Sequence, residues 1–265
     1  MRAIWSGAIA FGLVNVPVKA YAATSDHDVH LHQVHDRDGG RIRYERRCEV
    51  CGDKVEYAHI DRAYDDGEKT VVLAAEDLGS LPAAQRREIE VVQFVPSAQI
   101  EPITLSSSYY LSPDPKAAKA YTLLRRTLES SDVTAVVTFA LRQRTNLGVL
   151  RVHEGVLVLQ AMIWPDELRE VDPPEEARVS ERELGLAADL VDQLRGDFDA
   201  DSYEDTYQVE LRTLIDAKLT AGESVDTAAT FGEVAAETED GGTVIDLMEA
   251  LRRSIDARRK PAQGA

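Results

Sequence analysis

The first two thirds of the chain consist mostly of short runs in which apolar and polar residues alternate or β-branched residues predominate. Residues 4–22 contain two extended runs around Pro17, and further runs follow at 70–74, 88–95, 108–111, 133–141, 147–152 and 156–163. Turn residues separate these runs, as is typical of short β-strands. The pattern predicts a mainly β fold with some α structure, built as an antiparallel barrel or sandwich.

One helix is predicted among these strands. Asp114 and Pro115 form a typical helix start, with a capping side chain followed by proline at the first helical position. Tyr121, Leu124 and Leu128 then recur at helical spacing on one face, and the helix should end near Ser130.

A charged hairpin is expected after the first two strands. Residues 28–35 alternate, Asp38-Gly39-Gly40 is a turn signal, and residues 41–46 alternate again with charges at every second position. Such a hairpin has too little apolar material to bury both faces, so we expect it to project from its domain.

The pattern becomes helical after about residue 165. Pro173-Pro174 marks a boundary, a capping box at Ser180–Glu183 opens a helix through about Leu194, and a second helix should span residues 203–219 before Gly222. Residues 223–242 lack periodicity and indicate an acidic linker. Thr243 and Asp246 then begin an amphipathic helix that needs a partner surface, with Val244, Leu247, Leu251 and Ile255 on one face.

The net charge of −17 argues against nucleic-acid binding until its distribution is considered. Residues 165–205 hold fifteen acids and four bases, whereas residues 116–151 hold seven bases and two acids. Arginines also cluster at positions 41–47. These basic stretches are either phosphate-binding surfaces or ordinary solvated faces, and composition alone does not decide between them.

Location and redox state follow from simpler features. No apolar run approaches the roughly 18 residues of a membrane helix, and the first residues do not resemble a secretion signal. We therefore expect a cytoplasmic protein without a membrane partner. The two cysteines, Cys48 and Cys51, indicate a metal or redox motif rather than a disulfide scaffold.

The Cys48-x-x-Cys51-Gly52 motif has the form of a zinc-ribbon knuckle, in which two thiolates on a tight turn bind one metal ion. Zinc prefers four ligands, so the others would come from a nearby histidine, a carboxylate or another subunit. His35, His32, His30 and His59 are the candidate histidines. A thioredoxin-like redox role fits less well, because the motif does not begin a helix after a strand.

No catalytic residue is predicted. The chain contains neither a G-x-S-x-G nucleophile turn nor a phosphate-binding glycine loop ending in GK[ST]. The abundant carboxylates of residues 165–205 are interpreted as solvated helix surface. Arg142, Arg144 and Arg151 lie in a stretch without acids from Val133 to Val152, which suits phosphate contact or a solvated loop.

Several specific motifs resemble bacterial Ku, the homodimeric DNA-end-binding protein of non-homologous end joining. The resemblance rests on residues 4–19 (IWSGAIAFGLVNVPVK), on Gly39–Tyr44 leading into the cysteine pair, and on later motifs in the same order. These later motifs are Ser108–Leu111, Lys119–Leu124, Leu150-Arg151, Trp164–Arg169 and Tyr203–Tyr207.

This resemblance implies a β-barrel core at 1–175 with a bridge insertion at about 26–60, and a helical dimerisation arm at 176–222. It further implies an acidic linker at 223–242 and a partner-binding helix at 243–265 that contacts a multi-domain ATP-dependent DNA ligase. The implied function is non-enzymatic. A homodimeric ring would thread onto double-stranded DNA ends and contact only the backbone, without sequence specificity.

The resemblance also implies functional residues. Arg41, Arg43, Arg46 and Arg47 would line the bridge, and Lys19, Arg142, Arg144 and Arg151 would face DNA from the barrel. The implied ligase contacts are Leu247, Leu251, Arg252 and Ile255. No cofactor is required, but Cys48, Cys51 and His35 would hold a structural zinc ion if one binds. The alternatives are an adaptor that binds a protein through its cysteine hairpin and a metal-dependent nuclease.

Overall fold

The computed structural model describes residues 1–82, 86–222 and 247–259. The described residues fall into two compact units, one within Met1–His27 and His32–Val171 and the other within Asp28–Leu31, 172–222 and 247–259. No helix within the described ranges is both long enough and apolar enough to cross a membrane.

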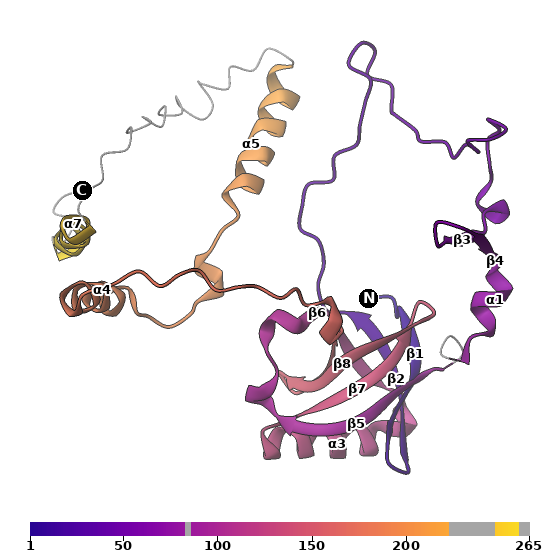
Figure 1. Ribbon diagram of the computed structural model, residues 1–265, viewed down its shortest axis with the longest axis horizontal. Coiled ribbons are helices and arrows are strands. Elements are labelled where there is room, and N and C mark those ends of the chain that lie inside the picture. The colour runs from indigo at the N-terminus through magenta and orange to yellow at the C-terminus, as the bar shows by residue number, and fades with distance from the viewer. Residues whose placement is uncertain (83–85, 223–246, 260–265) are drawn as a thin grey trace. The chain divides into compact units, whose positions relative to one another are not determined.

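The first unit contains a closed seven-stranded barrel, shown in Figure 1. Around the barrel the strands are β1 (Trp5–Phe11), β2 (Val14–Ala22), β6 (Leu105–Pro113), β9 (Val156–Met162), β8 (Arg144–His153), β7 (Val133–Leu141) and β5 (Glu88–Pro96). The barrel prediction is confirmed, with one difference in strand direction. All neighbouring strands are antiparallel except β1 and β5, whose three parallel residue pairs close the barrel.

The apolar core lies inside the barrel and beneath one helix. Alternate residues of the strands point inward, and Ile9, Ile89, Leu111, Leu150 and Leu157 are fully buried. Helix α3 (Ala118–Ser131) buries its predicted stripe of Tyr121, Leu124 and Leu128 in the same core. The sequence pattern therefore identified the buried face correctly, but the predicted start at Asp114 and Pro115 is wrong. Pro115 begins a separate 3₁₀ turn, Asp114 makes no capping hydrogen bond, and α3 begins at Ala118.

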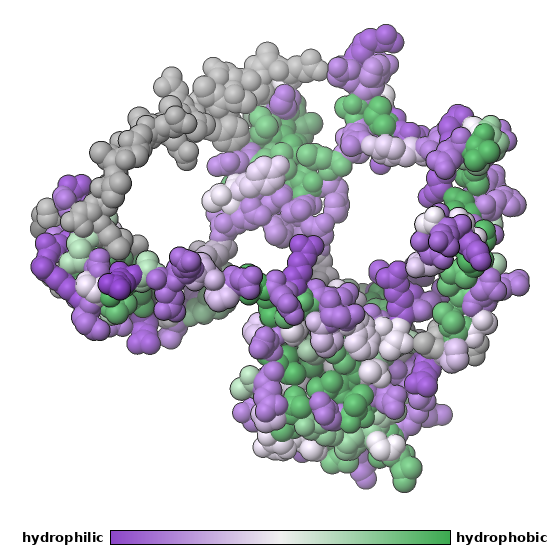
Figure 2. Space-filling view, viewed as in Figure 1, coloured by the Kyte–Doolittle hydropathy of each residue, from purple (hydrophilic) through white to green (hydrophobic). Residues whose placement is uncertain are grey.

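Residues 23–87 leave the barrel after β2 and return to it at β5, and we call them the bridge segment (Figure 1). Its regular elements are the 3₁₀ turn η1 (Tyr57–His59), strands β3 (Arg62–Asp65) and β4 (Thr70–Leu73), and helix α1 (Ala75–Ser80). From Leu31 to Val72 no residue is buried, and only Cys48 and Val55 are even half-buried. Hydrophilic side chains accordingly lie along much of this segment (Figure 2).

The predicted regular hairpin is wrong in its detail. Neither residues 28–35 nor residues 41–46 form a strand, and one isolated pair, Val34 with Arg41, is all that remains of the ladder. The turn itself is present, because His35 N–H donates to Gly40 O at 2.8 Å and Ile42 N–H donates to Gln33 O at 2.9 Å. The charged alternation thus indicated extended chain, but every residue from Leu31 to Arg46 is exposed, so no packing supports a longer ladder.

The second unit is helical, as predicted. It contains α4 (Glu181–Leu194), α5 (Thr206–Ala221) and α7 (Leu247–Arg259). The capping box is confirmed, since Glu183 N–H donates to Ser180 Oγ and Ser180 N–H donates to the Glu183 carboxylate at 2.7 Å. Helix α5 is capped by Gly222, as predicted, but it begins at Thr206 with Asp205 as its N-cap rather than at Tyr203.

Helix α7 packs against α4. It lies within the predicted C-terminal amphipathic helix, and Ile255 is buried there. The start of that predicted helix, Thr243 to Asp246, and the acidic linker at 223–242 lie outside the described residues. The remaining 3₁₀ turns are η2 (Ser97–Gln99), η3 (Pro102–Thr104), η4 (Pro115–Ala117), η5 (Pro165–Glu167) and η6 (Ala200–Ser202).

Candidate nucleic-acid interface

Three arginines surround a hollow of about 300 Å³ at one rim of the barrel. The hollow is lined by Ile4, Trp5, Ser6, Arg86, Arg87, Ala140, Arg142 and Gln143. None of these residues is acidic, although Arg86 makes a 3.6 Å ion pair with Glu90. Guanidinium groups beside hydroxyl and amide groups suit phosphate oxygens. We call this hollow the arginine rim.

Strand pairing brings the parts of the arginine rim together. The parallel pairing of Ala8 with Glu88 places Arg87 beside β1, and Ala8 N–H donates to Arg87 O at 3.0 Å. In the antiparallel pair of β1 and β2, Ser6 lies opposite Lys19. The predicted DNA contact Lys19 therefore neighbours a residue of the rim, although its ammonium also lies 3.9 Å from Asp114.

Arg142 reaches the rim from a strained turn. A two-residue loop, Arg142-Gln143, connects β7 and β8, because Leu141 pairs directly with Arg144. Both loop residues have positive φ, 53° and 65°, in a turn that usually takes Asn-Gly. Non-glycine residues with positive φ cost free energy, and such strain is concentrated at functional sites. Arg144 is exposed at the start of β8, directly beside this turn.

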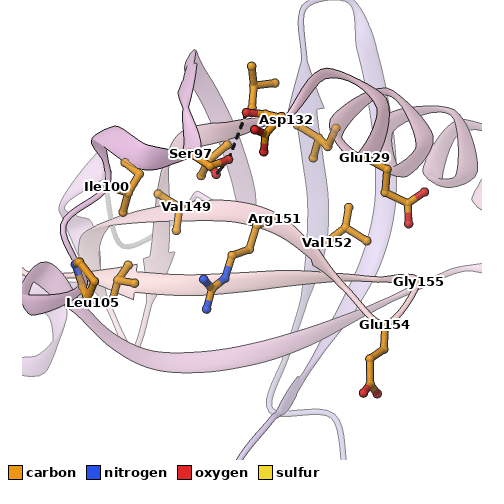
Figure 3. Close-up of a pocket in the computed structure, with 14 residues that line it drawn as sticks. Ser97, Ile100, Leu105, Glu129, Asp132, Val149, Arg151, Val152, Glu154 and Gly155 are labelled. Carbon is orange, nitrogen blue, oxygen red and sulfur yellow. Dashed lines mark hydrogen bonds between the residues drawn. The ribbon is translucent and has the colours of Figure 1, made fainter. Parts of the chain in front are cut away.

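Arg151 lies elsewhere. It lines a separate hollow of about 440 Å³ near the end of α3, together with the acidic residues Glu129, Asp132 and Glu154 (Figure 3). That hollow shares no lining residue with the arginine rim. The structure therefore does not bring Arg151 together with Arg142 and Arg144, and its acidic neighbours make this hollow a poor phosphate site.

Sequence reasoning missed Arg86 and Arg87. These residues precede β5 and follow residues 83–85, so no alternation in the sequence marks them as part of a surface with Arg142. Their role becomes visible only through the pairings of β5 with β1 and β7. The signal available in the sequence was the Arg86-Arg87 pair itself, immediately before a strand.

The four predicted bridge arginines are all exposed, but they differ in their contacts. Arg46 lies 5.3 Å from the ring centre of Tyr57, and Arg47 donates to Gly52 O at 3.0 Å and to the Glu45 carboxylate. These two arginines therefore help to organise the cysteine turn. Arg41 and Arg43 have no ion pair among the described residues, so they can contact an anionic partner.

The predicted metal ligands Cys48 and Cys51 lie on a closed turn. Cys48 N–H donates to Asp53 O at 3.0 Å, Gly52 N–H donates to Cys48 O at 2.9 Å, and Gly52 has a φ of 74°. Hydrogen bonds from the backbone N–H groups of Cys51 and Val50 lower the pKa of the Cys48 thiol. These features fit a thiolate knuckle for zinc.

The predicted third ligand, His35, is not brought to this turn. Its Nδ1 lies 3.1 Å from the Asp38 carboxylate. Within the described ranges, no third histidine, cysteine or carboxylate has a ligand atom placed to join the two thiols. The knuckle therefore offers two zinc ligands from one chain.

The predicted ligase contacts lie on α7 and differ in exposure. Ile255 is buried, Leu251 is half-buried and Arg252 is exposed, while the Leu247 side chain lies outside the described part. Since α7 packs against α4, its apolar face is already partly covered, and Arg252 lies on the accessible side.

Comparisons with known proteins find matches to one family over nearly the whole chain. The family model described as the Ku70/Ku80 beta-barrel domain matches residues 10–186. The chain is 57% identical over 263 residues to the non-homologous end joining protein Ku of Leifsonia xyli subsp. xyli, covering 97% of this chain and 88% of that protein. It is 46% identical to the non-homologous end joining protein Ku of Mycobacterium tuberculosis (strain H37Rv), covering 98% and 97%.

A phage relative matches over a shorter stretch. The Protein Ku of Mycobacterium phage Omega is 47% identical over 224 residues, covering 83% of this chain and 79% of the phage protein. The family match spans most of the barrel, and the bacterial relatives match across both units. The chain belongs to the Ku family.

Proposed function

We propose that this protein binds double-stranded DNA ends in non-homologous end joining, as a homodimer that encloses the duplex without reading its sequence. The observation that carries the proposal is the acid-free arginine rim on a Ku-family barrel. Membership of this family and the names of the relatives support the DNA-end role.

The proposed contact is electrostatic and directed at the phosphate backbone. Arg86, Arg87 and Arg142 of the rim, with Arg144 and Lys19 beside them, would contact phosphates from the barrel. Arg41 and Arg43 would contact the duplex from the bridge segment. Such contacts carry no sequence information, so binding should depend on the ends and on salt rather than on sequence. This role needs no bond-breaking step.

Two partner proposals accompany this function. A second copy of the chain would complete the ring, because one barrel with one bridge segment does not enclose a duplex. A multi-domain ATP-dependent DNA ligase would be recruited through α7, where Arg252 is exposed and available to a partner. We also propose that Cys48 and Cys51 hold a structural zinc ion.

A competition experiment tests the DNA-end role. The purified protein is titrated onto a labelled linear duplex, and either unlabelled linear DNA or covalently closed circular DNA of the same sequence is added. We expect linear DNA to compete strongly and circular DNA to compete weakly, because only linear DNA offers an end. Equal competition would contradict end binding, and no binding at all would favour the protein-binding adaptor.

A further inference from the structure

The second unit buries a polar side chain where an apolar one would be expected. In its described part only two residues are buried, Gln208 of α5 and Ile255 of α7. Gln208 is only 6% exposed. A buried amide destabilises a fold unless its oxygen and its N–H groups find hydrogen-bond partners. The partners of Gln208 therefore decide whether its burial is favourable.

Both ends of the Gln208 amide bind the start of the bridge segment. The side-chain oxygen Oε1 accepts from Val29 N–H at 3.1 Å, and Nε2 donates to the Asp28 carboxylate at 3.0 Å. Residues 28–31 accordingly belong to the same compact unit as α5. Only a side chain that carries both a donor and an acceptor can bind these two partners together. We call this pair of hydrogen bonds the Gln208 anchor.

The Tyr203–Tyr207 motif ends immediately before Gln208 and supplies the cap of its helix. The Asp205 carboxylate accepts from Gln208 N–H at 3.1 Å, which fixes the backbone of Gln208 in the first turn of α5. The amide therefore starts from a fixed position, and Val29, which it binds, is half-buried. A residue of the motif thus helps to position the anchor.

The bridge segment depends on such an anchor, because it has no core of its own. From Leu31 to Val72 no residue is buried, so apolar packing does little to offset the entropy of this stretch. The turn of the bridge segment pairs Val34 with Arg41. Only four residues separate Val29 from Val34. Fixing Val29 therefore restricts the chain that carries Arg41.

We infer that Gln208 is a positioning residue for DNA-end binding, which holds the start of the bridge segment on α5 so that Arg41 and Arg43 are presented to the duplex. A segment that is already ordered loses less conformational freedom when its partner binds, so the anchor raises the affinity. The inference rests on the proposed DNA-end binding, and it adds the residue that organises one of the two contact regions.

Gln208→Glu in the full chain tests the anchor with almost no change in side-chain size. The variant loses the donor and places a second carboxylate beside Asp28. Hydrogen exchange at the Val29 amide should become roughly tenfold faster, while residues 210–219 keep the protection of a folded helix. The affinity for a labelled linear duplex should fall by roughly tenfold. Gln193→Glu, the same change at an exposed position of α4, is the matched control and should alter neither measurement.

A compensating change tests the pairing itself. Asp28→Asn alone keeps an acceptor for the Gln208 amide and should bind DNA like the wild type. Combined with Gln208→Glu, it supplies a donor for the new carboxylate and removes the repulsion between two carboxylates. The combined variant should therefore bind within about twofold of the wild type. Loss of protection throughout α5 in Gln208→Glu that Asp28→Asn does not restore would mean a structural role alone and would overturn the inference.

A further comparison tests whether the anchor acts through the bridge arginines. Arg41→Ala with Arg43→Ala removes the contacts that the anchor is inferred to present. Adding Gln208→Glu to this pair should then weaken binding by less than about twofold, because coupled residues are not additive. A full additional tenfold loss would show that Gln208 does not act through these arginines, and would overturn the inference.

Failure of the anchor is distinguishable from failure of the proposed function. Wild-type protein that does not bind DNA ends would overturn both. End binding by the wild type together with equal binding by Gln208→Glu would overturn the anchor alone.

Discussion

Tyr121 shows how one side chain secures the barrel end beneath α3. Its hydroxyl donates to Leu111 O and accepts from Leu157 N–H, both at 2.8 Å, and so connects α3 with β6 and β9. Burial raises the pKa of this phenol, because the ionised form would lose its solvation. The neutral hydroxyl is therefore the form that stabilises the fold, and its contribution is lost as pH rises above the usual tyrosine range.

Removing this hydroxyl should destabilise the barrel. Tyr121→Phe leaves a buried carbonyl and a buried N–H without their partner, which costs about 2 kcal/mol. We expect the melting temperature to fall by roughly 4–8 °C, as measured by calorimetry. Tyr110 lies next to Leu111 on β6, so Tyr110→Phe serves as the control and should have the melting temperature of the wild type. Equal effects of both changes would contradict the role assigned to the Tyr121 hydroxyl.

Arg142 should make a phosphate contact that Arg151 does not make. Each phosphate contact contributes about 0.9 to the slope of log affinity against log salt concentration. Arg142→Ala should therefore weaken binding to linear duplex. It should also make the salt dependence less steep, by about one unit of slope for each protein chain bound. Arg151→Ala is the matched control because Arg151 lies among Glu129, Asp132 and Glu154. If the salt dependence of binding changed in Arg151→Ala but not in Arg142→Ala, Arg151 rather than Arg142 would be the residue that contacts phosphate.

The arginines also show what a sequence can reveal about a site. Arg144 and Arg151 were grouped because they lie close in sequence without an intervening acid. Seven residues of β-strand extend roughly 23 Å, so the two side chains lie near opposite ends of β8. Arg86 is distant from Arg142 in sequence, yet both line one hollow because β5 pairs with β7.

At the scale of elements, the barrel depends on the short parallel pairing that joins β1 to β5. Only three residue pairs make this closure, beside Gly7. A Cβ atom at Gly7 would lie 2.1 Å from Arg87 O and 2.3 Å from the Trp5 ring. Glycine is therefore required here by close approach of the backbone, which also determines the position of Arg87 in the rim.

Gly7→Ala should consequently strain the barrel and displace the arginine rim. Overpacking of this kind costs about 1–3 kcal/mol, and we expect weaker DNA binding together with a lower denaturation midpoint. Gly185→Ala is a suitable control, because its Cβ meets nothing within 4 Å on helix α4. That change should be neutral or should stabilise α4 by up to about 1 kcal/mol. Unchanged stability of Gly7→Ala would contradict the closure described here.

Helix α7 has two faces with different expected roles. Ile255→Asp should release α7 from α4, because it places a charge in a buried contact. Hydrogen exchange of residues 181–194 should then become faster. Arg252→Glu should leave this exchange unchanged, since Arg252 is exposed, but should weaken ligase capture by about tenfold.

The reverse pattern would contradict these assignments. Faster exchange in Arg252→Glu, or full ligase capture by this variant, would mean that the exposed face of α7 is not the partner surface. Asp256→Asn, which alters another exposed residue of α7, provides the control and should affect neither measurement.

The elements differ in how well the sequence predicted them. Strands with strong apolar alternation were located closely, since residues 133–141 and 156–163 correspond to β7 and β9. Strand β6 was predicted too short, at 108–111, because the serines Ser106 and Ser107 lack the apolar alternation that marks its start. The closing parallel pair was not predictable, because no local pattern specifies which distant strand becomes a neighbour.

At the scale of the whole molecule, charge is distributed by segment rather than balanced throughout. The acidic stretch at 165–205 accounts for a net charge of −11, out of −17 for the chain, whereas the arginine rim lies on the barrel. The net charge therefore says little about DNA binding, because phosphates respond to the local surface within a Debye length of about 10 Å. On this account, only the arginine rim and the exposed bridge arginines Arg41 and Arg43 have to be basic.

The claim that the protein encloses DNA is tested most directly by topological trapping. The protein is loaded onto a linear duplex fixed to a bead at one end, the free end is then blocked with a bulky protein, and the salt concentration is raised until electrostatic contacts are lost. The proposed ring should remain on the blocked DNA, leave DNA with an open end, and be released when the blocked DNA is cut. Equal loss from blocked and open DNA at the same salt concentration would contradict a closed ring and indicate simple surface binding.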